Sequence, residues 1–535
     1  MANTIKSLII TLILGLIIYY VTLPALNITS LGFWFFILSI CFIYLIIYTS
    51  FFISNPIKII NRARNIEFPL SIKVVLTSFF IIIIGIFTIN FILSPIFFAK
   101  DYAKRIIVNQ NTSFIDDIKE VDFNKIPLLD KASTTKLGDR TMGQQTSWVS
   151  QFYVSDLYTQ INYNNEIIRV TPLEYDGLIK YFTNRKDGIK GYITVNSVNG
   201  QANLEVLNEG MKYMPSAYLS EDLYRKLRFT YPTLIFDEAN FELDDNGKPY
   251  WIIPYIKYVG IGIRKDIIGA IILDPVTGDS TKYKVEDIPK WVDHVYNADL
   301  IIESLNDWGN YQNGFLNSIF GQKDVVNTTE GYNYLTFDDD VYLYTGITSV
   351  AADESNIGFV LTNLRTKETK YYNVPGAEEY SAMKSSEGLV QEKGYEATFP
   401  LLINLNNRPT YLMSLKDEAG LVKMYAFVDV EDYQKVVTTE ASLGIEEAAR
   451  RYLNEVSFDN SNANIITKEI TINSIISAII DGNTYYYITD TDNNRYSLSI
   501  KVNTSLIPFL SDDDKVEIKY RENNNINEII DIKTI

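Results

Sequence analysis

Residues 269–285 read GAIILDPVTGDSTKYKV, and two further segments of the chain repeat the same phrase. Residues 191–207 read GYITVNSVNGQANLEVL, and residues 358–374 read GFVLTNLRTKETKYYNV. Each copy opens on glycine, alternates apolar with other residues, and breaks at a short turn. Such alternation around a Val-Asn-Gly or Val-Thr-Gly turn predicts a β-hairpin. The third copy has Lys367 where the others have glycine, so we expect a different turn or a strained positive φ there.

A second strand pair precedes each of these hairpins. Residues 241–258, FELDDNGKPYWIIPYIKY, align with residues 158–175, YTQINYNNEIIRVTPLEY, and more loosely with residues 334–349. Residues 408–430 look like a further, shortened relative. The polar turn Asp-Asp-Asn-Gly between apolar strands is typical of a hairpin. The sequence therefore predicts a sheet unit that is repeated along the chain.

A short helix is predicted before the best copy. Residues 220–232 read SEDLYRKLRFTYP, with Ser220 as the expected N-cap, acids in the first turn and Pro232 as the stop. A helix followed by two strand pairs makes an α+β sheet module. The repeated unit is therefore expected to be such a module.

The stretch from Ser220 to Pro289 resembles a PepSY-type domain, especially in GKPYWIIPYI followed by IIGAIILDPVTGDSTKY. The D-x-x-T-G turn of that family corresponds here to Asp274, Thr277 and Gly278. The neighbouring copies share the resemblance only in outline. The resemblance implies an extracytoplasmic, non-catalytic module that binds or restrains peptidases and other envelope proteins.

Three long uncharged runs occupy the first hundred residues: Leu8–Leu26, Leu31–Ile53 and Val74–Phe98. Each has the roughly 20 residues that an α-helix needs to cross the hydrocarbon core of a bilayer. A soluble protein would need a very large core to bury all three, so we predict transmembrane helices. No small-x-small cleavage site closely follows the first run, and we expect it to be retained rather than removed as a signal peptide.

The loops between these runs predict an orientation. The link at residues 27–30 is uncharged, whereas the link at residues 54–73 is basic. Its basic residues are Lys58, Arg62, Arg64 and Lys73. Basic loops stay in the cytoplasm, so the N-terminus is expected inside and everything after about residue 100 outside. The predicted location is the plasma membrane, as a multi-pass protein with a large extracytoplasmic region.

Charge and cysteine content narrow the class of protein. Residues 1–100 hold six basic residues and one acid, and the remaining 42 basic and 64 acidic residues give the rest a balance of −22. An acidic surface repels nucleic-acid phosphate and argues against DNA or RNA binding. It also repels anionic lipid headgroups, so we expect the soluble part to stand off the bilayer. The single cysteine, Cys41, excludes an intrachain disulfide, which for an exported protein favours a bacterial envelope.

The C-terminal third is predicted to contain helices and a barrel. Residues 293–320 have apolar side chains at helical spacing, which indicates an amphipathic helical hairpin packed on a sheet. A second helix is expected at 444–456, before a polar linker at 457–464. From Glu469 onward, five short alternating strands are expected to close a small OB- or SH3-like barrel.

The predicted fold class is a set of N-terminal transmembrane α-helices, then tandem α+β sheet modules that are PepSY-like, then a small C-terminal β-barrel. The predicted domains are a three-helix membrane anchor at 1–100, a linker at 101–150, two PepSY-like repeats at 151–292, a helical connector at 293–325, a further α+β repeat at 326–440, a helix and linker at 441–464, and the barrel at 465–535.

Catalytic motifs are scarce. His294 is the only histidine, so a Ser-His-Asp or Cys-His arrangement could be built only there. We interpret its WVDHVY context as a helix start with the ring in a structural role at a surface or interface. HExxH, GxxxxGK[ST] and GxGxxG motifs do not occur in the sequence. No residue is therefore predicted to be catalytic, to bind a cofactor or to ligate a metal.

Acidic clusters raise the question of calcium. Asp490, Asp492 and Asn494 have the opening spacing of an EF-hand loop, but Arg495 and Lys501 stand where a glycine and a bidentate glutamate are needed. The remaining clusters are Asp338 to Asp340 and Asp512 to Asp514. We interpret both as solvated turns. Weak binding of extracellular Ca²⁺ is the alternative interpretation.

Three functions remain open from the sequence. The first is a non-catalytic binding, scaffolding or regulatory protein of the bacterial cell envelope, whose partner is an envelope protein or a cell-wall polymer. The second is an envelope hydrolase that uses paired carboxylates, for which nothing in the sequence singles out a pair. The third is an accessory subunit of a transport or secretion system. No charge lies within any of the three apolar runs, where transport sites usually show themselves.

Overall fold

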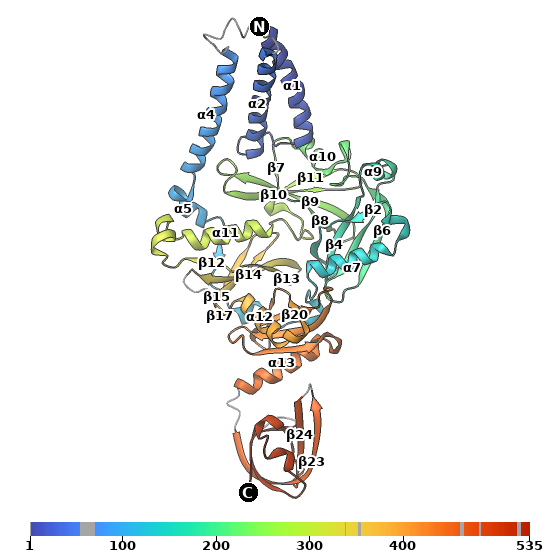
Figure 1. Ribbon diagram of the computed structural model, residues 1–535, viewed down its shortest axis with the longest axis vertical. Helices are drawn as coiled ribbons and strands as arrows, with labels where there is room; N and C mark the ends of the chain where they lie inside the picture. Colours follow the sequence, from blue (N-terminus) through green and yellow to red (C-terminus); the bar gives the residue numbers. More distant parts are fainter. Residues whose placement is uncertain are drawn as a thin grey trace. The chain divides into compact units, whose positions relative to one another are not determined.

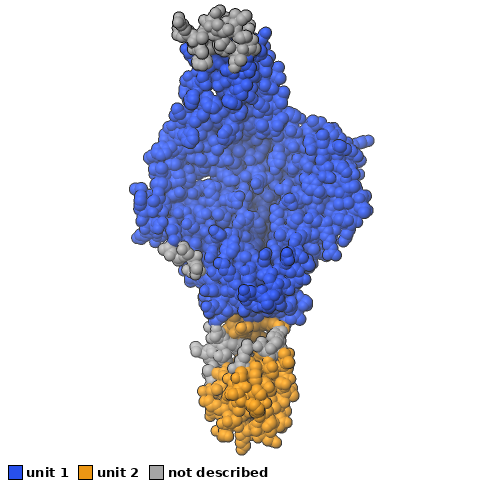
Figure 2. Space-filling model, viewed as in Figure 1, with its two compact units in different colours: residues 1–449 blue, residues 450–535 orange. Residues whose placement is uncertain are grey.

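The structure is a computed structural model that describes residues 2–53, 70–337, 339–350, 355–460, 465–480, 483–521 and 526–535. The chain forms two compact units, residues 1–449 and residues 450–535, which Figure 2 colours separately. Each unit contains apolar cores made from its own segment of the chain.

Three apolar helices open the chain: α1 (Ala2–Thr22), α2 (Leu31–Ile53) and α4 (Leu70–Ile92). Each is long and apolar enough to cross a membrane, which fits the predicted multi-pass membrane protein. Two ends differ from the sequence prediction, because residues 23–26 and 93–98 lie outside α1 and α4. Pro24 and Pro95 account for this, since the residue before a proline is disfavoured in helical conformation.

The chain turns sharply after α4. The short helix α5 (Pro95–Ala103) begins with its proline in the first turn. Arg105 follows it and is buried, donating to Glu303 at 2.8 Å and also to Asp307. Both acids belong to α11 (Ala298–Tyr311), so an ion-pair cluster ties the end of the apolar segment to the sheet region. Of the basic residues that predict orientation, Lys58, Arg62 and Arg64 lie outside the described residues, and Lys73 lies in α4.

Four sheets with one common strand order follow within the described residues. The first contains β2 (Phe152–Val154), β3 (Thr159–Tyr163), β4 (Glu166–Tyr175), β5 (Ile189–Asn196) and β6 (Ala202–Met211). The second contains β7 (Ile235–Phe236), β8 (Asn240–Leu243), β9 (Pro249–Tyr258), β10 (Lys265–Leu273) and β11 (Ser280–Lys284). In each sheet the first, third, fourth and fifth strands lie in that order, and the second strand pairs with the third.

The third and fourth sheets repeat this plan. The third contains β12 (Val326–Thr328), β13 (Asn333–Phe337), β14 (Asp340–Ser349), β15 (Ser355–Asn363) and β16 (Thr369–Tyr372), with β1 (Val108–Asn109) and β17 (Gly376–Ala377) added at its edges. The fourth contains β18 (Glu396–Ala397), β19 (Leu401–Leu405), β20 (Arg408–Lys416), β21 (Val422–Asp429) and β22 (Val436–Glu440).

Residues 326–440, predicted as one further repeat, thus contain two complete sheets. The fourth copy was hidden because Met424 stands where the others open on glycine, just after a β-bulge. The corresponding glycines are Gly191, Gly269 and Gly358. Its turn is also longer, since the backbone N–H of Asp429 donates to Lys435, whereas that of Asp274 donates to Asp279. Without the glycine and the short turn, only a shortened relative could be recognised.

The turn of the repeated phrase has one construction in all four sheets. An Asn or Asp closes the fourth strand, and one of its side-chain oxygens accepts from the backbone N–H groups of the residues two and three positions later. These residues are Asn196, Asp274, Asn363 and Asp429. Gly200 and Gly278 then adopt φ of 76° and 77°, and Lys367 adopts 66°. Of the two alternatives expected at Lys367, the structure shows the positive φ.

The second sheet is covered on both faces. Trp251 and Ile253 of β9 enter an apolar core shared with the first sheet. Ile252 and Ile256, on the opposite face of the same strand, enter a core shared with α11 and the third sheet. A strand that is buried on both faces needs a nearly continuous apolar sequence, which explains the run YWIIPYI.

A helix precedes each sheet: α7 (Lys131–Gly143), α10 (Leu223–Thr230), α11 and α12 (Glu379–Leu389). Because α7 lies within residues 101–150, the predicted linker contains regular structure. The N-cap of α10 is Asp222, whose carboxylate accepts from the Arg225 N–H at 2.7 Å, and not the predicted Ser220. The predicted second helix after α11 is a single π-helical turn, Asn317–Gly321.

The C-terminal segment closes a five-stranded barrel in the order β23 (Ile465–Ile480), β24 (Asn483–Asp490), β25 (Arg495–Ser499), β27 (Asn527–Thr534) and β26 (Lys515–Arg521). This confirms the predicted small barrel. Apolar side chains such as Ile472, Leu498 and Val516 fill its interior. The preceding helix, α13 (Ile445–Asn460), is longer than predicted, and residues 461–464 of the predicted linker lie outside the described residues.

Hydrogen bonds join the second sheet region to the ends of the apolar helices (Figure 1). In the link between α1 and α2, the Leu26 N–H donates to Pro232 O at 2.8 Å, and Thr29 O accepts from the Gly262 N–H at 2.9 Å. Near the end of α4, the Asn90 amide donates to Ile261 O and accepts from the Ile261 N–H, both at 2.9 Å. All three helices are therefore fixed to one sheet module.

Candidate functional site

A cavity of about 310 Å³ lies beside the segment of residues 117–127. Part of this segment runs along β19 of the fourth sheet and is held there by backbone contacts. The Val121 N–H donates to Asn404 O at 2.9 Å, and the Asn404 amide donates to Ile118 O at 2.7 Å. Leu335 and Thr336 of the third sheet complete the wall. The cavity is large enough for a small ligand or for the side chain of a partner.

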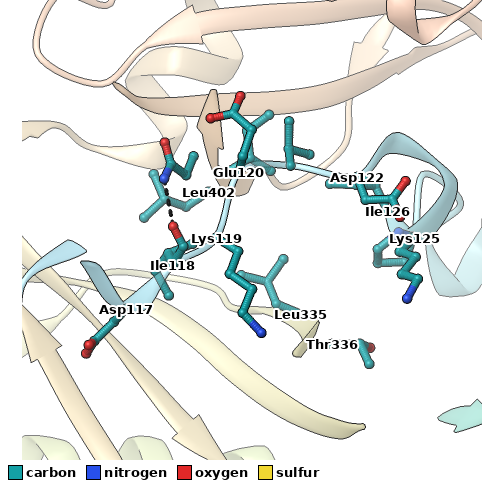
Figure 3. Close-up of a pocket in the computed structure, with 14 residues that line it drawn as sticks. Asp117, Ile118, Lys119, Glu120, Asp122, Lys125, Ile126, Leu335, Thr336 and Leu402 are labelled. Atoms are coloured by element: carbon teal, nitrogen blue, oxygen red, sulfur yellow. Dashed lines mark hydrogen bonds between the residues drawn. The ribbon is translucent and has the colours of Figure 1, made fainter. Parts of the chain in front are cut away.

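Charge is distributed unequally around this cavity. Figure 3 shows Lys119 and Lys125 pointing to the same side of the segment as Leu335 and Thr336, while Glu120 points to the opposite side. The Glu120 carboxylate accepts from the Asn406 N–H at 2.7 Å. The lining also contains Asp117 and Asp122, so the wall carries both signs of charge, and Lys125 donates to the Asn165 side chain at 2.9 Å.

Two polar atoms in the wall have no hydrogen-bond partner among the described residues. They are Asn404 Oδ1 and Thr336 Oγ1. Asn404 is only 3% exposed, and its side-chain oxygen is buried within the wall. We find no nucleophile with an adjacent base among the residues that line this cavity.

A second polar cluster is buried where the first three sheets meet. Glu242 of β8 is fully buried, and its two oxygens accept from the N–H groups of Asp293 and His294 at 2.8 and 2.9 Å. The Asp293 carboxylate accepts in turn from the Asn162 N–H at 2.8 Å. His294 Nε2 lies 2.6 Å from Gln160 O, and because a carbonyl only accepts, this nitrogen carries the proton.

Burial shifts the pKa of each group in this cluster. It raises the pKa of Glu242 to about 8, against the opposing effect of the two backbone donors. It also raises the pKa of Asp293 well above its ordinary range, with the nearby Glu242 charge adding to the effect. For His294, burial lowers the pKa to about 4 and favours the neutral ring.

The side chains of this cluster stabilise the fold and are closed to a substrate. Glu242 and Asp293 are 0% and 2% exposed, so a substrate has no access to them. Their oxygens accept from backbone N–H groups of neighbouring segments, which fixes the junction between sheets. The expected structural role of His294 at an interface fits this position, but the ring is buried and no helix begins there.

The acidic clusters considered for calcium act as turns where they are described. Asp490 is buried and accepts from the N–H groups of Asp492 and Asn494 at 2.9 and 2.8 Å. Asp514 accepts from the Ser511 N–H at 2.8 Å, and Asp340 pairs with Arg365. Asp338 lies outside the described residues. Across the described ranges, no group of three or more His, Cys, Asp and Glu side chains could hold a metal ion.

Comparison with known proteins adds no relative. No family profile matches the sequence, and no characterised protein is significantly similar to it. A function has to be inferred from the contacts of the chain itself.

Proposed function

We propose that this protein is a membrane-anchored, non-catalytic binding or scaffolding protein of the bacterial cell envelope, and that its four sheets are PepSY-like modules. The observation that carries the proposal is the hydrogen-bonded joint between the three apolar helices and the second sheet, at Leu26, Thr29 and Asn90. A simple tether requires no such joint. A fixed joint holds the sheets in a defined orientation at the membrane surface, as a scaffold requires.

The joint also supports an extracytoplasmic location. Because Leu26 and Thr29 are hydrogen-bonded to residues 232 and 262, the link between α1 and α2 and the sheet modules share one side of the membrane. Three spans place the basic link 54–73 on the other side, which is cytoplasmic by the distribution of basic residues. Taken together, the joint and the distribution of basic residues support an extracytoplasmic location of the sheets.

The buried carboxylates support binding over catalysis. A carboxylate-pair hydrolase needs two acids that face a shared cleft. Glu242 and Asp293 are neighbouring acids, but both are buried and accept from backbone N–H groups. The proposal therefore assigns these acids to the joint between sheets.

The outer edge of β6 suits an extended partner segment. This ten-residue strand ends its sheet, and no described strand pairs with its outer edge. It contains neither lysine nor proline, the residues that usually protect an edge, and its Val206 is 68% exposed. The third sheet is different, because β1 of the same chain covers the edge at β16. A partner would add a strand to β6 through backbone hydrogen bonds.

Crosslinking in the native membrane tests this function. A photoreactive amino acid at Asn208 of β6 is expected to capture one defined envelope protein or wall polymer in living cells. The same probe at Leu389, an exposed position on α12, is the control and should capture nothing specific. Val206→Lys should reduce capture at least fivefold, because a lysine disfavours strand addition at an edge. Equal capture at 208 and 389, or hydrolysis of wall material that Glu242→Gln abolishes, would overturn the proposal.

A further inference from the structure

Exposed apolar side chains gather where the first two sheet modules meet the end of α1. We name this surface the α9–α10 face, and it consists of α9 (Leu178–Asn184), residues 218–221 and α10. Its exposed apolar residues are Leu178, Ile179, Phe182, Leu219 and Phe229. Ile179 is 78% exposed and Phe229 is 55% exposed. Single exposed residues need no explanation, but a contiguous group indicates a binding surface.

The depth of this face is fixed by α1. The membrane-spanning stretch of α1 ends at Thr22. In its last turns, the Tyr20 ring lies 6.2 Å from the Phe229 ring and 4.4 Å from the Arg225 guanidinium. Arg228 Nε donates to Leu23 O at 2.9 Å and so caps the carboxyl end of the helix. Helix α10 therefore sits at the level where α1 leaves the hydrocarbon core, among the lipid headgroups.

Helix α9 continues the same surface. The Tyr181 hydroxyl donates to Tyr218 O at 2.8 Å and to the Glu221 carboxylate at 2.7 Å. Arg185 pairs with the same carboxylate at 3.2 Å. Figure 1 shows α9 and α10 at the end of the sheet region where α1 and α2 arrive. The face is thus one rigid patch that adjoins a membrane helix.

The charge of this face is opposite to that of the molecule. Helix α10 reads LYRKLRFT, with no acid and three basic residues, of which Arg228 is buried. Helix α9 carries Lys180, and Arg185 and Lys186 follow it directly. The acids nearby in the sequence are Asp176, Asp187, Glu221 and Asp222. Two of them are engaged, Glu221 with Arg185 and Asp222 as the N-cap of α10. This local basic charge lies within a region, residues 101–535, whose balance is −22.

We infer that the α9–α10 face lies in the headgroup and upper acyl layer of the bilayer that holds α1, α2 and α4, where it binds anionic lipid. Exposed Leu, Ile and Phe beside Lys and Arg are the composition of an interfacial helix. The expectation that the soluble part stands off the bilayer followed from average charge, and it does not describe this face. The inference requires only that the three apolar helices span a membrane, whichever side the sheets occupy.

Depth-dependent fluorescence quenching tests this inference on the full chain. With Cys41→Ser removing the only native cysteine, Ile179→Cys is labelled with the fluorophore NBD and the protein is reconstituted in vesicles. The vesicles contain phosphatidylcholine with or without 30% phosphatidylglycerol, and lipids with a doxyl quencher near the headgroup. Leu389→Cys is the matched control, since it is also an exposed apolar residue on a helix. Quenching of at least twofold is expected at 179 and none at 389.

A second comparison tests whether binding of the α9–α10 face to the bilayer depends on anionic lipid. Phosphatidylglycerol should increase the quenching at 179, and Lys186→Glu combined with Lys226→Glu should cancel that increase, because anionic lipid binds the basic side chains. An unquenched, water-exposed label at 179 would overturn the inference and leave the face to a protein partner. Equal quenching at 179 and 389 would also overturn it, because lipid contact would then not be confined to this face.

Discussion

His294 is the only histidine of the chain, so its titration can be used to probe the junction between the sheets. Burial lowers its pKa from 6.5 to about 4, so between these values the folded state binds fewer protons than the unfolded state. Stability contributed by this ring is therefore complete above pH 6.5 and is lost as the pH falls toward 4. We expect the stability advantage of the wild type over His294→Asn to grow by up to about 3 kcal/mol between pH 4 and 6.5. Thermal unfolding in detergent measures it, and a constant difference would contradict the buried neutral ring.

The stability contributed by Glu242 should depend on pH in the opposite direction to that contributed by His294. Burial raises its pKa to about 8, so the folded state binds more protons than the unfolded state between pH 4.5 and 8. Its contribution to stability is present at low pH and is lost as the pH rises through 8. Glu242→Gln should remove this dependence and cost about 1–3 kcal/mol, because the new amide nitrogen must face a backbone N–H. Glu209→Gln, on the exposed side of β6, is the control. If both variants had the same free energy of unfolding at every pH, the buried position assigned to Glu242 would be contradicted.

Elements of the repeat differ in how tightly their turns are packed. Gly200 and Gly278 share a positive φ, so alanine at either position costs about 1–2 kcal/mol in backbone strain. A Cβ on Gly278 would also lie 2.4 Å from the Tyr213 ring, whereas on Gly200 the nearest atom is a Leu129 methyl at 3.3 Å. We therefore expect Gly278→Ala to destabilise the protein by about 1–3 kcal/mol more than Gly200→Ala. Chemical denaturation of the two variants provides the test, and equal losses would show that the Tyr213 ring moves aside.

The sequence predicted those elements whose pattern is local. Period-two alternation after an opening glycine identified three sheet units, and long apolar runs identified three helices. The fourth sheet lacks the opening glycine, having Met424 instead, so its pattern was incomplete. The predicted linker at 101–150 concealed α7, whose composition is polar, with burial of Ser133, Thr134 and Met142 provided by tertiary contacts.

The candidate cavity could not be predicted, because it depends on contacts between distant residues. Asn404 reaches Ile118 across a separation of 286 positions, and neither residue belongs to a recognisable motif. The cluster around Glu242 is equally non-local, although the single histidine pointed to one of its members. Side chains that act through tertiary contact alone leave no local pattern in one sequence.

The two compact units of the molecule should fold independently. The barrel has its own apolar core, which includes Ile472, Ile518 and Ile532. A fragment of residues 462–535 is expected to unfold in a single cooperative transition in urea. Within this fragment, Ile518→Ala should lower the free energy of unfolding by about 2–5 kcal/mol, because it leaves a cavity in the core. A fragment without a cooperative transition would show that the barrel needs the rest of the chain.

Cysteine labelling of whole cells tests the central claim, that the sheets are fixed to the outer ends of the membrane helices. In a Cys41→Ser background, Leu389→Cys should react with a membrane-impermeant maleimide on intact cells. Asn61→Cys, in the basic link, should react only after the cells are permeabilised. The reverse pattern, with residue 61 labelled from outside and residue 389 protected, would place the sheets in the cytosol and contradict the account.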